Sequence, residues 1–143
     1  MAAVQPALII MPAISLGLIL GIYEALVIHR DVTIPTHRFG HMTHALLLSV
    51  LFVFISMNVP LVYSMAPALK AIPLLGNVIA VQVLVGLIAA VKIHGVSAAL
   101  KTTGMMSAGM AETWFHSILI GGLIIAAPYI YPVVAPMLPL WMK

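Results

Sequence analysis

Histidines and one glutamate form the most specific chemical pattern in this chain of 143 residues. His37, His41 and His44 are spaced by four and then three residues, which on a helix places them on one face. Glu112 and His116 repeat the four-residue spacing before the last apolar stretch. Neutral imidazole is a common ligand of transition metals, and carboxylates can complete a mixed site. The pattern predicts a site for copper, zinc or iron formed by these five residues.

Two further histidines offer an alternative or a second site. His29 and His94 each follow an apolar stretch, and two histidines from facing helices can hold a b-type haem. The positions near helix ends favour a non-haem metal over a buried haem. A third interpretation needs no cofactor, since the C-terminus of a helix favours a cationic side chain. The three interpretations remain open at this point.

Glu24 is the most informative single charge because it lies within the first apolar stretch. A carboxylate inside a membrane is costly and points to a function by default. Lys92 lies at a similar position near the end of the third stretch. The pair therefore has two interpretations. Either Glu24 and Lys92 form a buried ion pair, or Glu24 belongs to a path for protons or cations.

Small residues recur every fourth position in the first apolar stretch, at Ala13, Gly17, Gly21 and Ala25. Such a stripe lets two helix backbones approach closely in lipid, where dispersion and weak hydrogen bonds drive association. We expect it to pack against another helix of the same bundle. The alternative is a seam between subunits of an oligomer.

Four apolar stretches position these residues, and each is close to the roughly 20 residues that cross a bilayer as a helix. They cover residues 6–29, 42–63, 74–93 and 113–131. Hydrophobic residues make up 64% of the chain and charged residues 6%, too few to cover a soluble surface. The expected fold is an all-α integral membrane protein, with four transmembrane helices in a bundle forming a single domain.

An internal duplication is a further possibility for this bundle. Aligned on their final histidines, the ends of the first and third stretches match at four positions: Gly21/Gly86, Ala25/Ala90, Ile28/Ile93 and His29/His94. His44 and His116 also correspond, 72 positions apart. The four helices would then be two repeated helical hairpins. Chance matches between apolar segments are the alternative.

Basic residues set the expected orientation, because Lys and Arg favour the cytoplasmic side. The segments around the first and third connections carry Arg30, Arg38, Lys92 and Lys101, against Lys70 and Lys143 on the other side. We therefore expect an integral protein of the cell membrane with both termini outside the cytoplasm.

Three classes of function are compatible with this pattern. The favoured one is a subunit of a larger membrane complex, or a homo-oligomer, with a histidine-based metal or haem site. The second is a small transporter or channel for protons or cations that uses Glu24 and polar residues of the third span. The third is a structural or assembly protein without a cofactor. No nucleophile or phosphate-loop motif indicates an enzyme, no basic stripe indicates nucleic acid, and without cysteine there is no thiolate metal site.

Overall fold

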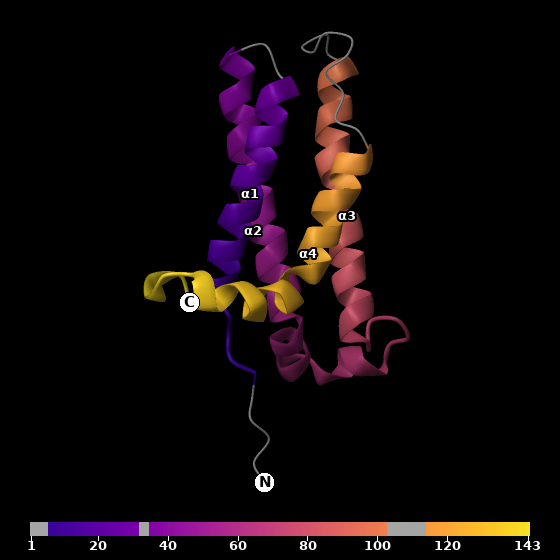
Figure 1. Ribbon diagram of the computed structural model, residues 1–143. Helices are drawn as coiled ribbons and strands as arrows, with labels where there is room; N and C mark the ends of the chain where they lie inside the picture. The colour runs from indigo at the N-terminus through magenta and orange to yellow at the C-terminus, as the bar shows by residue number, and fades with distance from the viewer. Residues whose placement is uncertain (1–5, 32–34, 103–113) are drawn as a thin grey trace.

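Four long helices make up most of the chain in the computed structural model. It describes residues 6–31, 35–102 and 114–143, with side-chain surroundings for 6–26, 42–95 and 114–143. The helices are α1 (Met11–Asp31), α2 (Pro35–Met65), α3 (Val78–Thr102) and α4 (Trp114–Val134). They run alternately up and down as two hairpins side by side (Figure 1). No strand occurs in the described ranges, so the expected all-helical class is confirmed there.

Three of the helices contain segments long and apolar enough to cross a membrane. These segments are Met42–Met65, Val78–Gly95 and Trp114–Met137. In α1 the apolar segment among the residues with described side chains is shorter and covers Met11–Leu26. The whole of α1 nevertheless has 21 residues, about 31 Å of helix, close to the thickness of a bilayer's hydrocarbon core. The structure thus supports a helical membrane bundle with three spanning candidates and one shorter apolar helix.

The helices begin at different residues from those that the apolar pattern predicts. The first stretch was expected from Pro6, whereas α1 begins at Met11. Asn58 of α2 explains the difference, because its side-chain amide binds both backbone groups of Ile9, a residue that precedes α1. Its Nδ2 donates to the carbonyl oxygen of Ile9 at 2.9 Å, and the Ile9 amide donates to its Oδ1 at 2.8 Å. This pairing satisfies the backbone amide and carbonyl of a residue outside the helix.

The third helix also begins later than expected, at Val78 rather than near residue 74. Leu74 has a positive φ of 71°, which no helical residue adopts. Asn77 then caps the helix, since its Oδ1 accepts hydrogen bonds from the amides of Ile79 and Ala80 at 2.9 and 3.2 Å. Hydropathy alone could not separate this apolar turn from the helix that follows it.

Glycines bring the two helices of the first hairpin into backbone contact. A Cβ at Gly17 would lie 2.6 Å from the Cα of Val50, and a Cβ at Gly21 would lie 2.8 Å from the Cα of Leu46. Real Cβ atoms essentially never approach backbone so closely. Both stripe positions therefore face α2 of the same chain.

The second hairpin crosses through another pair of glycines. Cβ atoms built on Gly86 of α3 and on Gly121 of α4 would each lie 2.6 Å from the other glycine's carbonyl oxygen. Gly122, the next residue, has open space where its Cβ would be. Small residues thus set the close approach of helices in both hairpins, as they do in lipid generally.

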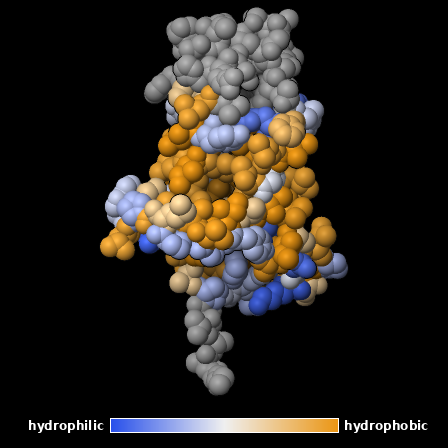
Figure 2. All heavy atoms as spheres, in the orientation of Figure 1, coloured by the Kyte–Doolittle hydropathy of each residue, from blue (hydrophilic) through white to orange (hydrophobic). Residues whose placement is uncertain are grey.

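The two hairpins meet through a core of buried apolar side chains. Its fully buried members include Val53 of α2, Ala89 of α3, and Ile120 and Ile124 of α4. Ala13 of α1, the first residue of the small-residue stripe, belongs to the same core. The outer surface is apolar as well, and Figure 2 shows hydrophobic residues around the middle of the visible face, with more polar residues toward both ends. This distribution suits a bundle surrounded by lipid.

Both ends of the described chain lie at the same end of the bundle (Figure 1). There α4 continues through Pro128 and Pro132 to Val134, and two short 3₁₀ turns follow, η2 (Ala135–Met137) and η3 (Leu140–Met142). Ser15 Oγ of α1 donates to the carbonyl oxygen of Met142 at 2.9 Å, which fastens the C-terminal segment to the first helix. The connection between α2 and α3, with the 3₁₀ turn η1 (Pro67–Ala71), lies at this end too.

Candidate functional site

Glu24 is the one carboxyl group whose side chain the structure describes, and it lies inside the bundle. It is only 1% exposed. The fully buried hydroxyl of Ser49 on α2 donates to Glu24 Oε2 at 2.7 Å. Glu24 lies three residues after Gly21 on α1, so it is on the same face of the helix, the one that contacts α2. The glycine crossing therefore brings α2 close enough for the serine to reach the carboxylate.

Lys92 does not accompany Glu24 into the bundle. Its side chain is exposed on α3, and no ion pair joins it to Glu24 within the described residues. The buried face of α3 carries Val85, Ala89 and Ile93 at four-residue spacing. Lys92 is rotated about 100° away from Ile93 and so leaves that face. The structure brings Glu24 together with Ser49 rather than with the lysine.

A second buried hydroxyl, that of Ser117 on α4, lies near the level of Ser49, as contacts between neighbouring helices indicate. Gln82 Nε2 of α3 donates to the carbonyl oxygen of Ser56 on α2 at 3.2 Å, so these two residues lie at the same level along the bundle. Ser49 comes seven residues before Ser56 on α2, and Ala89 comes seven residues after Gln82 on antiparallel α3. Both therefore lie about 10 Å from that hydrogen bond in the same direction, at a shared level. On α4, Gly121 contacts Gly86 and Ala90.

Ser117 precedes Gly121 by one turn, so it lies within about one turn of the level of Ser49. The side chain of Ser117 is fully buried, and its Oγ has no hydrogen-bond partner among the described residues. We call Glu24, Ser49 and Ser117 the polar layer: buried polar groups from three helices whose levels along the bundle agree within about one turn.

A second polar group lies toward the end of the bundle that holds both termini. Tyr129 of α4 donates its hydroxyl to Gln82 Oε1 at 2.8 Å, while Gln82 Nε2 donates to the Ser56 carbonyl. Gln82 and Ser56 are buried, and Ser56 Oγ has no hydrogen-bond partner within the described ranges. Val53, fully buried, lies between Ser49 and Ser56 on α2. Two polar regions are therefore separated by an apolar stretch of about two turns.

The predicted metal ligands are only partly described. His44 is exposed on α2, whereas His116 is 8% exposed on α4. Glu112 and the side chains of His37 and His41 lie outside the described residues. No group of three or more histidines, aspartates or glutamates that could hold a metal ion occurs in the described part of the chain. The five-residue metal site stays a prediction.

His94 stacks on an aromatic ring instead of facing a described metal ligand. Its ring lies 3.8 Å from that of Trp114, between centroids, with 17° between the planes. The side chain of His29, its proposed haem partner, is outside the described residues. The stack joins the end of the apolar segment of α3 to the start of α4, a position that suits an amphipathic pair at a membrane boundary.

Sequence reasoning identified Glu24 but missed Ser49 and Ser117. A serine in an apolar helix is ordinary, because its hydroxyl can bond to the backbone of its own helix. The available signal was the face that each serine shares with other residues: Ser49 with Val53, and Ser117 with Gly121. That signal could be interpreted only once the packing arrangement of the helices was known.

Comparison of the chain with protein-family models, curated proteins and solved structures finds no match. The fold defines the class only coarsely, as an all-helical protein with membrane-type helices. The functional argument therefore rests on the residues of this chain.

Proposed function

We propose that this protein is a small membrane-embedded transporter or channel for protons, with Glu24 as the group that takes up and releases the proton. The observation that carries the proposal is the burial of this carboxyl in a bundle of membrane-type helices, with the Ser49 hydroxyl as its described donor. The other two classes, a metal- or haem-binding subunit and a structural protein, are competing proposals.

Charge balance favours transport over a purely structural role. An ionised carboxylate removed from water costs several kcal/mol unless a partner compensates it. Lys92 is exposed, so the expected counter-charge is absent from the described surroundings of Glu24. One hydroxyl donor stabilises the charge only partly. A proton or a cation arriving at the carboxylate would complete the balance, and this is the property a carrier group needs.

The number of polar groups in the polar layer favours a proton over a metal cation. Glu24, Ser49 and Ser117 supply one carboxylate and two hydroxyls. Hard cations such as Ca²⁺ need six to eight oxygen ligands, and Mg²⁺ needs octahedral geometry. A proton needs one acceptor. The Ser117 hydroxyl, which has no hydrogen-bond partner among the described residues, provides a site where water could bind in the layer.

The polar group at Ser56, Gln82 and Tyr129 supports a route toward the end that holds both termini. Buried polar groups in membrane helices are found along substrate and ion paths. The apolar stretch around Val53 separates this group from Glu24, and an apolar constriction can gate a path by excluding water. Access to Glu24 would then depend on small movements of α2 against α4.

Transport is tested with purified protein in phosphatidylcholine vesicles that contain a pH-sensitive dye. A potassium gradient with valinomycin drives proton uptake. We expect the wild type to acidify the vesicle interior faster than empty vesicles, and Glu24→Gln to abolish the difference. Asp31→Asn, the same chemical change at the end of α1, serves as the matched control. Equal flux through wild type and Glu24→Gln would refute the role of Glu24.

A second measurement, on the same purified protein, distinguishes the metal-binding alternative from proton transport. Elemental analysis of the wild type beside His44→Ala and His116→Ala measures bound copper, zinc and iron, and a Soret band would report haem. Metal present in wild type and lost from both variants would support the metal-binding subunit. Co-purifying membrane proteins would support a larger complex, whereas normal stability without flux, metal or partners would favour a structural role.

The orientation of the protein belongs to this proposal as well. The basic residues around the first and third connections favour a cytoplasmic position for the end opposite both termini. Glu24 lies near that end of α1, and the Ser56 group lies toward the outer side. Protons entering through the outer polar group would reach Glu24 after crossing the apolar stretch.

A further inference from the structure

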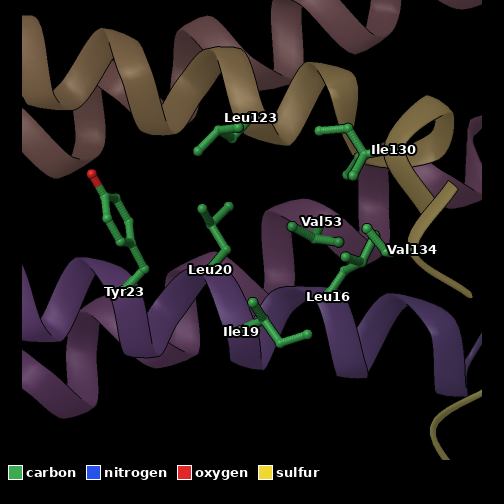
Figure 3. A pocket seen from close by; sticks show the side chains of 9 residues that line it. Leu16, Ile19, Leu20, Tyr23, Val53, Leu123, Ile130 and Val134 are labelled. Atoms are coloured by element: carbon green, nitrogen blue, oxygen red, sulfur yellow. The ribbon is translucent and has the colours of Figure 1, made fainter. Parts of the chain in front are cut away.

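An apolar groove runs between the two hairpins, where α1 and α4 face each other. Its volume is about 330 Å³, within the lower range of pockets that bind small ligands. The fully buried Val53 of α2 forms its floor. Figure 3 shows Leu20 and Leu123 pointing into it from opposite helices, and Figure 2 shows a hollow in the apolar face of the molecule. The groove is thus lined by α1, α2 and α4 and open on one side.

The groove extends along α1. Its lining there runs from Leu16 to Tyr23, about 10 Å of helix, and α4 lines it from Leu123 to Val134, where the C-terminal part of α4 bends across the bundle (Figure 1). Apart from the Tyr23 hydroxyl, the side chains that line it are hydrocarbon. An apolar space of this length fits a segment of a hydrocarbon chain lying along α1.

The way the helices pack explains why the space exists. Glycines draw α1 against α2 and α3 against α4, whereas α1 and α4 meet through branched side chains such as Leu20 and Leu123. The two hairpins therefore separate along this line. An unfilled apolar space loses dispersion contacts along its walls. Ile19, on the rim, is 45% exposed, so the open side faces the region that lipid occupies.

Tyr23 marks one end of the groove at a defined depth. In the sequence the apolar stretch of α1 continues to Ile28 and is followed by His29 and Arg30. Tyr23 thus lies about five residues, or about 8 Å of helix, before that polar end. Tyrosine is enriched toward the ends of membrane spans, where its ring is in hydrocarbon and its hydroxyl reaches polar groups. In Figure 3 the hydroxyl points across the groove toward α4.

We propose that this groove binds one acyl chain of a bilayer phospholipid, with the chain along the groove and an ester carbonyl accepting a hydrogen bond from the Tyr23 hydroxyl. Tyr23 lies at the end of the groove nearer the polar end of the bundle, which suits the ester end of the chain, and the apolar lining below suits the tail. The open side lets the chain enter from the surrounding bilayer. This lipid site does not depend on proton transport by Glu24.

The test measures lipid retained by the protein. Protein reconstituted in dioleoyl phosphatidylcholine vesicles is extracted in mild detergent and washed, and phospholipid per chain is measured by mass spectrometry. We expect about one phosphatidylcholine per wild-type chain. Ala127→Phe, which fills the groove from α4, should lower retention by about tenfold or more, since 1.4 kcal/mol of lost affinity is a factor of ten. Ile118→Phe, on the exposed face of the same helix, should retain the lipid.

Two further variants and one further lipid test the proposal. Leu123→Phe fills the groove from a half-buried position, so it provides the measurement if Ala127→Phe unfolds. Tyr23→Phe should keep the fold and lower retention, because only the hydroxyl is lost. Equal retention by wild type and the groove-filling variants, or none by wild type, would overturn the proposal. Retention of oleic acid in place of phosphatidylcholine, from vesicles doped with it, would overturn the assignment to a phospholipid.

Discussion

Ser49 Oγ donates a 2.7 Å hydrogen bond to Glu24 Oε2, and neither side chain is more than 1% exposed. The contact joins α1 to α2 where both side chains are buried inside the bundle. A hydrogen bond in such surroundings is stronger than in water, and an unmet polar group is correspondingly costly. The pair therefore matters both for the stability of the hairpin and for the chemistry of the carboxyl.

Replacing Ser49 by Ala should destabilise the protein by about 1–3 kcal/mol, because Glu24 is left buried without this donor. Thermal unfolding in detergent micelles measures the effect. Ser56→Ala is the matched control: Ser56 is also fully buried on α2, but its hydroxyl makes no hydrogen bond with the described residues. Equal loss of stability in the two variants would mean that the bond to Glu24 contributes nothing.

Gly17→Ala should destabilise the bundle by about 1–3 kcal/mol, the usual cost of inserting atoms into a packed interior. The added Cβ would lie 2.6 Å from the Cα of Val50, and backbone cannot rotate away as a side chain can. Gly122→Ala, with open space at the new Cβ, should be neutral or slightly stabilising because alanine favours helix. A Gly17→Ala variant as stable as Gly122→Ala would show that α1 and α2 are further apart than described.

The order of the helices along the chain followed from the sequence, but their boundaries did not. Apolar runs predicted four helical segments because membrane-type helices are apolar on all sides. The true beginnings of α1 and α3 depend on Asn58 and Asn77, which satisfy backbone amides. Asn58 acts across 49 residues of sequence. A long-range contact of that kind has no local pattern by which to predict it.

The candidate site was predictable only in its charged member. Glu24 stood out because a carboxylate in an apolar stretch is rare, and the structure buries it. Its expected partner was Lys92, chosen by depth alone. Depth along the membrane does not fix the rotation of a helix, and Lys92 lies off the buried face of α3. The actual partner, Ser49, became recognisable only once Gly17 and Gly21 had fixed which face of α1 meets α2.

Replacing Asn58 by Leu should loosen the start of α1. The substitution removes both hydrogen bonds to the backbone of Ile9, at 2.8 and 2.9 Å, and a buried backbone group left without a partner costs about 1–3 kcal/mol. Amide hydrogen exchange should become faster at Ile9 and remain unchanged at the middle of α4. Protection of Ile9 equal to that in wild type would contradict the proposed role of Asn58.

The absence of cysteine from the chain makes its orientation directly measurable. A single introduced cysteine is then the only thiol available to a membrane-impermeant maleimide. Lys70 lies in η1 and Lys143 at the C-terminus, both exposed and at the same end of the bundle. In intact cells we expect Lys70→Cys and Lys143→Cys to be labelled from outside, because the Lys and Arg bias favours a cytoplasmic position for the opposite end.

Lys101→Cys, toward the other end of α3, should be labelled only after the membrane is permeabilised. Labelling of Lys101→Cys alone in intact cells would reverse the orientation and with it the expected direction of approach to Glu24. Labelling of all three in intact cells would mean that the helices do not span the membrane, since the two ends of the bundle would then face one compartment.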